Sequence, residues 1–283
     1  MSSSFMKSRN LTLGLCAVVV FCFPSALGQT GNLMYSPVLV NVSDGSGSGF
    51  YFSRGNTTYF VTAAHVVMSN PTTLRSPSIT LTSYLPARKR GSSQMVKIEL
   101  SIGRADTLGE LKADVIHDVA VVRISRDTTE NGVGRMYFLS YVHFVINPDT
   151  GFISSSAITP FESAIVTSDA YLFGYPSAIG VPNLPQLDYT QPLIRRGIIA
   201  GKNYAKKTII IDCMVYPGNS GGPVFEIDEV PEGKSFRLIG LVSEFIPFED
   251  IWVNQRFGIA NHQWLNSGYG VVVPVDFMLD LMR

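Results

Sequence analysis

Residues Pro217–Pro223 of this 283-residue chain have the sequence PGNSGGP, and this stretch decides how the rest is interpreted. A serine hydroxyl is a poor nucleophile at neutral pH and needs an imidazole to accept its proton. Glycines beside a serine permit the tight turn that directs backbone N–H groups towards a developing negative charge. The stretch therefore predicts Ser220 as a nucleophile, with the N–H groups of Gly218 and Ser220 forming an oxyanion hole.

Two segments upstream supply the groups that such a serine needs. Residues 62–66 (TAAHV) follow a strand-like run, and residues 117–122 (HDVAVV) begin another. We expect His65 to act as general base and then general acid, and Asp118 to orient the imidazole and stabilise its charged form. The chain order His, Asp, Ser is that of chymotrypsin and differs from the orders in subtilisin and the α/β-hydrolases.

Other acidic and imidazole side chains leave one alternative open. Asp114 and Asp106 lie close to Asp118 in the sequence, and either could hold the imidazole instead. His117, His143 and His262 have no ligand-like spacing, and the cysteines form no zinc motif. We therefore expect no metal and no organic cofactor.

Composition favours an all-β protein. The chain has 22 basic and 22 acidic residues, is 46% hydrophobic and 16% charged, and contains 25 Gly and 16 Pro. This excludes a disordered tail and a polybasic nucleic-acid binder. Short β-rich runs alternate with turn residues, and the candidate helix is Val275–Met282, with a turn possible at Ala63–Val66. The candidate strands are Val38–Val42, Gly49–Phe52, Thr58–Thr62, Ile79–Thr82, Val96–Ile102, Val119–Ile124, Ala170–Phe173, Ile198–Ala200, Thr208–Ile211, Pro223–Ile227, Arg237–Val242 and Val271–Val273.

The first 28 residues have the pattern of a secretory signal peptide. Lys7 and Arg9 precede the apolar run Leu11–Phe23, and Pro24 and a small-residue site at Ala26–Gly28 follow it. The alternative is a buried helix or an uncleaved anchor. Removing residues 1–28 leaves one cysteine, Cys213, so we expect an exported domain, secreted or periplasmic, without an internal disulfide. No apolar run is long enough to span a bilayer.

Taken together, the motifs resemble those of trypsin-like serine peptidases, and among them the HtrA-type branch. Gly47–Phe50 (GSGF) is similar to the opening of the first barrel in that branch, and the histidine, aspartate and serine motifs follow in order. Weaker landmarks occur at Phe173–Pro176, Arg196–Ile198 and Gly270–Pro274. The resemblance implies two six-stranded antiparallel barrels, at about 33–145 and 164–283, and a short C-terminal helix. One protease domain, 29–283, then fills the mature chain and leaves no room for a PDZ domain.

The residue before the nucleophile departs from trypsin and chymotrypsin. Those enzymes have Asp there, which pairs with a new N-terminal amine after activation cleavage, whereas this chain has Asn219, as the HtrA-type branch does. We expect no activation through that ion pair. Cys213, close to the nucleophile, is interpreted as a buried small hydrophobe and not as a reactive thiol.

The resemblance also suggests where the substrate lies. The position that is acidic in trypsin corresponds to Met214, or to Val215 if the alignment slips by one residue, which favours a medium apolar side chain before the scissile bond. The backbone of Ser243, Glu244 and Phe245 is expected to pair with an extended peptide.

The sequence thus predicts a serine endopeptidase that acts on polypeptides and binds no nucleic acid; it does not determine the oligomeric state, although a monomer is favoured. Two alternatives remain: a catalytically silent trypsin-like fold that serves as an exported binding or chaperone module, and a narrow ester hydrolase using the same triad.

Overall fold

The computed structural model describes residues 19–20, 35–85, 94–130, 133–144, 152–177, 185–188, 191–230 and 233–283. The predicted signal peptide lies outside the described residues, apart from Val19–Val20, which form the short strand β1 against β11. No helix in the described ranges is long and apolar enough to cross a membrane.

The N-terminal half forms one eleven-stranded sheet with the path β1-β11-β10-β4-β3-β2-β7-β8-β12; β9 pairs with β10 and β13 with β3. Its elements, with the small β5–β6 ribbon and two helices, are β2 (Pro37–Val42), β3 (Gly45–Arg54), β4 (Thr57–Thr62), α1 (Ala64–Val67), β5 (Met68–Asn70), β6 (Thr73–Leu74), β7 (Ile79–Leu85), β8 (Gln94–Leu100), α2 (Ile102–Thr107), β9 (Leu111–Asp114), β10 (Val119–Glu130), β11 (Val133–Phe138), β12 (Val142–Phe144) and β13 (Phe152–Ser154).

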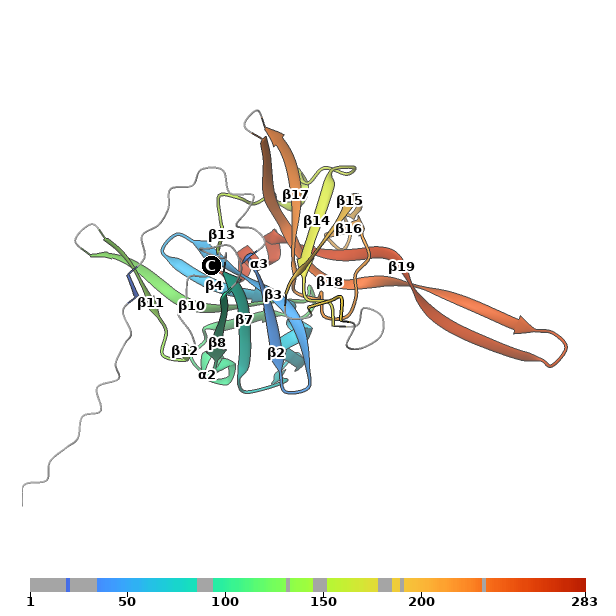
Figure 1. Cartoon of the computed structure of the whole chain (residues 1–283), viewed down its shortest axis with the longest axis horizontal. Coiled ribbons are helices and arrows are strands. Elements are labelled where there is room, and N and C mark those ends of the chain that lie inside the picture. The colour runs from blue at the N-terminus through green and yellow to red at the C-terminus, as the bar shows by residue number, and fades with distance from the viewer. Residues whose placement is uncertain are drawn as a thin grey trace, which may run out of the picture.

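The C-terminal half forms a closed barrel in the order β14-β15-β16-β19-β18-β17. A 3₁₀ helix precedes it and an α-helix follows it: the elements are η2 (Phe161–Ser163), β14 (Asp169–Gly174), β15 (Leu193–Asn203), β16 (Thr208–Asp212), β17 (Pro223–Val230), β18 (Gly233–Asn254), β19 (Ile259–Pro274) and α3 (Val275–Leu281). Figure 1 shows β18 and β19 continuing well beyond the barrel as a long hairpin.

The predicted all-β, double-barrel architecture with a C-terminal helix is confirmed, with differences in detail. The N-terminal sheet has more than six strands in the described part of the chain, because β1, β9, β11, β12 and β13 join the six candidate strands of that half. The pairing of β13 with β3 is parallel, so that sheet is not purely antiparallel. The short helix α2 and the long hairpin were not predicted.

Two apolar cores hold the halves. The larger one contains the inward side chains of the N-terminal sheet together with Phe173, Phe225 and Leu241 of the C-terminal barrel, so the halves share buried surface. The smaller one fills the barrel and includes Ile209, Ile211 and Cys213. Burial of aliphatic and aromatic side chains is the main favourable contribution to such a fold.

Helix α3 fastens the two halves together. Its Val275 and Met278 are fully buried in the larger core, against the N-terminal sheet. At its start the carboxylate of Asp276 accepts the N–H of Phe161 at 2.8 Å and pairs with Lys207 at 3.0 Å, both from the C-terminal half. Near its end the carbonyl of Leu279 accepts a hydrogen bond from Arg54 at 2.9 Å. Helix α3 is therefore bonded to both halves.

Candidate active site

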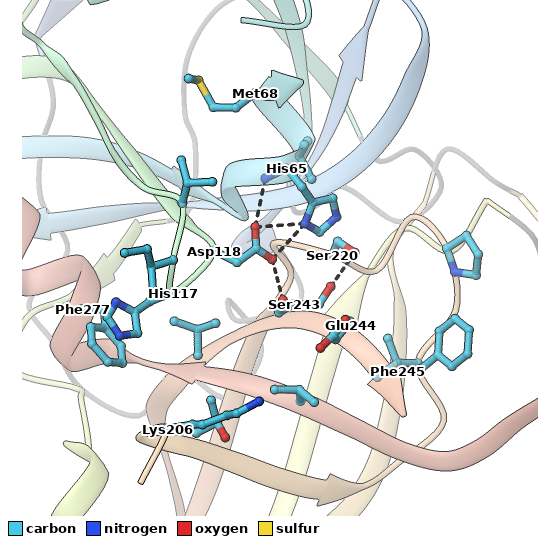
Figure 2. Close-up of a pocket in the computed structure, with 18 of the residues that line it drawn as sticks. His65, Met68, His117, Asp118, Lys206, Ser220, Ser243, Glu244, Phe245 and Phe277 are labelled. Carbon is cyan, nitrogen blue, oxygen red and sulfur yellow. Dashed lines mark hydrogen bonds and ion pairs between the residues drawn. The ribbon is translucent and has the colours of Figure 1, made fainter. Parts of the chain in front are cut away.

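A cleft of about 1250 Å³ lies between the two halves, and the three predicted reactive residues all line it. His65 belongs to α1, directly after β4; Asp118 ends the turn between β9 and β10; Ser220 lies in the loop between β16 and β17. Residues separated by up to 155 positions in the sequence are thus brought to one surface (Figure 2).

His65 and Asp118 form a closely bonded pair. The ring Nδ1 of His65 lies 2.8 Å from Oδ2 and 3.0 Å from Oδ1 of Asp118. The backbone N–H of His65 also donates to Oδ1, at 2.9 Å. With Nδ1 bonded to the carboxylate, Nε2 is the ring atom left to accept a proton, which is the tautomer that a general base requires.

Asp118 is held in an unusual backbone conformation. Its φ is +57°, in the left-handed region that few residues other than Gly adopt, although Asp tolerates it better than most. The conformation bends the chain just before β10 and turns the carboxylate back towards α1. Sparsely populated backbone conformations cluster at functional sites, where neighbouring contacts hold them in place.

A further contact to Asp118 was not predicted. The hydroxyl of Ser243 donates to Oδ2 at 2.5 Å, so this strand residue braces the carboxylate as well as facing the cleft. Burial alone would raise the pKa of Asp118, but the hydrogen bonds from His65 and Ser243 and the attraction to His65 outweigh it and leave the pKa lowered. Asp118 therefore carries its negative charge at neutral pH.

The alternative aspartates do not contact His65. Asp114 binds its neighbour His117, with 2.6 Å between Oδ2 and Nδ1, and accepts the N–H groups of Ile116 and His117. These bonds close the turn that leads into β10. Asp106 is an exposed residue of α2. Of the three candidate carboxylates, only Asp118 pairs with His65.

The hydroxyl of Ser220 points to a backbone acceptor in this structure. It donates to the carbonyl oxygen of Ser243 at 2.8 Å, and no hydrogen bond joins it to His65 among the described residues. Rotation about a single side-chain bond changes the direction of a serine hydroxyl, and hydrogen bonds between reactive groups often tighten only once substrate is bound.

The peptide groups around Ser220 are fixed by their carbonyls. The Pro217 carbonyl accepts two hydrogen bonds from Ser177, one from its backbone N–H at 2.9 Å and one from its hydroxyl at 3.2 Å. The Asn219 carbonyl accepts the N–H of Gly222 at 2.8 Å. In a trans peptide the N–H points opposite the carbonyl, and no peptide bond among the described residues is cis. The N–H groups of Gly218 and Ser220 are thereby aimed away from these partners, and neither has a hydrogen-bond partner in the described part of the chain.

Ser48 connects the loop between β16 and β17, which contains Ser220, to the N-terminal half. Its buried hydroxyl donates to the Gly218 carbonyl at 2.7 Å and accepts the Tyr175 N–H at 2.8 Å. Its backbone N–H donates to the Ser220 carbonyl, also at 2.8 Å. One residue of β3 thus holds two successive parts of the loop. The sequence pattern GSGF marked this segment but gave no indication of these contacts.

Two glycines of the loop are required by space and conformation. Gly218 has φ +91°, and a Cβ there would lie 2.4 Å from the Tyr175 carbonyl. Gly221 has φ +86°, and a Cβ would lie 2.1 Å from the Ser48 carbonyl. Real Cβ atoms do not approach oxygen so closely, so any other residue would displace the loop.

A family model for the trypsin-like peptidase domain matches residues 47–230, about two thirds of the chain. The chain belongs to the trypsin-like peptidase family. The match spans His65, Asp118 and Ser220, and the resemblance inferred from the motifs is confirmed at the level of the family.

Solved structures with a similar fold are distant in sequence. The serine endoprotease from Yersinia pestis is 16% identical with a TM-score of 0.48, and covers 88% of this chain with 62% of its own length. The HtrA-type protease AlgW, bound to a tripeptide, is 15% identical with a TM-score of 0.49, and the corresponding shares are 88% and 59%. Deg5 is 14% identical with a TM-score of 0.46, and 88% of each chain is covered. The search of curated protein sequences finds no match.

Strand β18 forms one wall of the cleft in this trypsin-like domain. Ser243, Glu244 and Phe245 all line the cleft (Figure 2). Of the two residues considered for the base of the specificity pocket, Val215 is buried and lines the cleft. The Met214 side chain is 48% exposed outside it, and its sulfur accepts the Tyr216 hydroxyl at 3.1 Å.

Cys213 and Asn219 are buried parts of the same trypsin-like domain. Cys213 is a free thiol in the barrel core. Burial raises its pKa, which Arg195 partly offsets, so it is a poor nucleophile. The Asn219 side chain accepts the Tyr216 N–H at 3.0 Å and so closes the loop locally. Among the described residues no three His, Cys, Asp or Glu side chains gather as metal ligands would.

Proposed function

We propose that this trypsin-like domain is a serine endopeptidase whose triad is His65, Asp118 and Ser220. The observation that carries the proposal is the His65–Asp118 pair, 2.8 Å apart, in the same cleft as Ser220 and two unpartnered N–H groups. Nucleophile, base, orienting carboxylate and oxyanion donors are the four parts that acyl transfer needs.

The reaction follows from these positions. Ser220 Oγ attacks the scissile carbonyl carbon and its proton passes to His65 Nε2, while the carbonyl electron pair moves onto oxygen. The N–H groups of Gly218 and Ser220 stabilise that oxyanion, each contributing about 2.7–4 kcal/mol in comparable enzymes. Collapse of the intermediate expels the amine, which takes the proton from His65. Water, activated by His65, then hydrolyses the acyl-enzyme.

The substrate preference follows from the cleft lining. A peptide extended beside Ser243–Phe245 directs the side chain before the scissile bond towards the Val215 wall, and a buried valine offers no charge for Lys or Arg. A medium apolar residue is therefore the proposed preference. The pattern of residues 1–28 supports export, to the periplasm or the exterior, as the setting for this activity.

A second candidate function deserves a direct test because of one observation. The Ser220 hydroxyl donates to Ser243 and not to His65. A catalytically silent domain that serves as an exported binding or chaperone module needs no hydrogen bond between Ser220 and His65.

One experiment separates the candidates. Hydrolysis of casein and of a small activated ester is measured with the native protein and with Ser220→Ala. An endopeptidase cleaves both, and Ser220→Ala loses both. Turnover of the ester alone favours a narrow ester hydrolase, and turnover of neither favours the silent module. Cleavage of casein that persists in Ser220→Ala would contradict the proposed nucleophile.

A further inference from the structure

The outer parts of β18 and β19, residues 247–266, form a hairpin that we call the arm. Its register runs from Pro247 opposite Asn266 to Asn254 opposite Ile259. Figure 1 shows the arm extending away from the body as a two-stranded ribbon. Since a two-stranded ribbon has no third strand to cover it, such hairpins are only marginally stable in isolation.

The arm exposes large apolar side chains. Every residue from Ile251 to Leu265 is exposed, and the side chains of Trp252 and Trp264 are 68% and 67% accessible. Because these two residues are on opposite faces in the register, each face of the ribbon carries an exposed tryptophan. Natural edge strands are usually protected by lysine or proline, and residues 248–265 contain neither.

The arm is a direct continuation of the strand that faces the cleft. Ser243, where the Ser220 hydroxyl binds, is the bulged residue between Val242 and Glu244 and has no partner on β19. From there to Asn254, β18 pairs only with β19, whereas β17 stops pairing with it at Leu241. Within the described residues, the edge of β18 opposite β19 therefore has no neighbouring strand from Ser243 to Asn254.

The base of the arm is fixed to the cleft. The Asn266 side chain donates to the Val215 carbonyl at 2.6 Å, and the Ser267 hydroxyl donates to the Ile246 carbonyl at 2.5 Å. A second bulge, between Phe245 and Pro247, bends β18 at the same point. The base of the arm is therefore bonded to Val215, a residue that lines the cleft.

We propose that the free edge of the arm binds the upstream part of an extended, unfolded polypeptide substrate as an added β-strand. The inference rests on the proposed peptidase activity and extends it from a few subsites to a long one. Addition of a strand to an open edge is a common mode of peptide recognition: main-chain hydrogen bonds supply affinity, and alternate side chains contact the neighbouring strand.

The direction and reach of the bound chain follow from the geometry. Antiparallel pairing is the more stable arrangement, and it directs the N-terminal part of a substrate outward along the arm. Paired residue for residue from Ser243 to Asn254, a substrate would contact β18 over about twelve residues, or roughly 40 Å at 3.3 Å per residue.

The charge of the arm favours such a chain over an anionic surface. Its ionisable groups are Glu249, Asp250, Arg256 and His262. Glu249 pairs with His262 at 2.6 Å, and Asp250 accepts the indole N–H of Trp252 at 2.9 Å. Without a basic patch, the recognition surface is aromatic and aliphatic, which suits the apolar segments that unfolding exposes.

The test is a series of peptides with one cleavage site and 4, 8 or 12 residues upstream, alternating apolar and polar. In the native protein we expect kcat/KM to rise with upstream length. In the double variant Trp252→Ala/Trp264→Ala, kcat/KM for the 12-residue peptide should fall about tenfold. Truncation of a tryptophan anchor commonly has an effect of at least that size. The 4-residue peptide should be cleaved equally by both proteins, which also shows that the variant is folded.

Two controls make the result specific. Phe257→Ala removes an equally exposed aromatic side chain from the tip, outside the paired strands, and should leave the length dependence intact. The same residues added downstream of the cleavage site should have no arm-dependent effect. If short peptides are cleaved but length has no effect, or if the tryptophan variant changes only the molar mass in solution, the inference is overturned while the peptidase function stands. If no peptide is cleaved, the proposed function itself fails.

Discussion

Asp118 is hydrogen-bonded to residues of both halves of the molecule at the cleft. Its two oxygens accept the ring and backbone N–H groups of His65 and the hydroxyl of Ser243, which come from different halves of the molecule. A partly buried carboxylate with several donors is stabilised in its charged form and fixed in position. The orientation of the His65 ring is therefore a property of both halves together.

Replacing this carboxylate should affect the chemical step. In Asp118→Asn we expect kcat to fall by about 10⁴, the loss seen when the equivalent change leaves the imidazole in the wrong tautomer. The matched control is Asp114→Asn, which removes a neighbouring aspartate that binds His117 instead. Steady-state kinetics on a peptide substrate check both. A similar loss in the two variants would contradict the assignment of Asp118.

The lowered pKa of Asp118 also predicts a pH dependence of stability. Because the folded state holds the carboxylate below its ordinary pKa of about 3.9, the unfolded state binds the proton more readily. The stabilisation is complete above that value and is lost as the pH falls through the folded pKa. The free energy of unfolding of native protein and of Asp118→Asn is measured with denaturant between pH 3 and 7. The difference between the two should shift in favour of the variant below about pH 4. A difference that stays constant with pH would contradict this.

Ser48 should matter for both stability and rate. In Ser48→Ala the Tyr175 N–H and the Gly218 carbonyl lose their buried partner, which costs about 1–3 kcal/mol of unfolding free energy. Loosening of the oxyanion loop should lower kcat by about tenfold or more with little change in KM. The control is Thr58→Val, since the buried Thr58 hydroxyl has no hydrogen-bond partner among the residues that the structure describes and its loss should not destabilise. Unfolding curves and kinetics measure both effects, and an unchanged kcat in Ser48→Ala would contradict the positioning role.

Among the elements, α3 is short but links the halves. Met278 is fully buried at the contact with the N-terminal sheet. Met278→Ala should lower the free energy of unfolding by about 2–5 kcal/mol through lost burial and an unfilled cavity. The side chain of the exposed Asp280, two residues further on, forms a surface ion pair with Arg283, so Asp280→Asn should change stability by less than about 1 kcal/mol. Equal effects of the two substitutions in chemical denaturation would show that α3 does not carry the inter-half packing.

The positions of some elements could be predicted from the sequence, and those of others could not. Strands such as β4 and β16 are rich in β-branched residues, and their positions could be predicted within one or two residues. The arm could not, because Pro247, Asn254 and Gly258 look like turn residues and because exposed aromatic residues give no core pattern. A slip of one residue also changes which side chain faces the pocket, which is why the sequence left Met214 and Val215 unresolved.

In the molecule as a whole, the cleft depends on contacts between distant parts of the chain. The motifs containing His65, Asp118 and Ser220 could be recognised because each is contiguous in sequence. The partners of Ser48 are Gly218 and Tyr175, 170 and 127 positions away, and the bond between Ser243 and Asp118 spans 125 positions. Such contacts follow from the packing of the two halves and have no local sequence signal. The shared core and α3 are what fix them.

We propose that the two halves together create one activated serine. Reaction with a fluorophosphonate, followed by peptide mapping, tests this proposal, because the reagent forms a covalent phosphonyl ester with loss of fluoride only where a serine is activated by its base. We expect a single adduct on Ser220, absent in Ser220→Ala and strongly slowed in His65→Ala. Folded native protein that forms no adduct on Ser220, or that is labelled equally fast without His65, would contradict it.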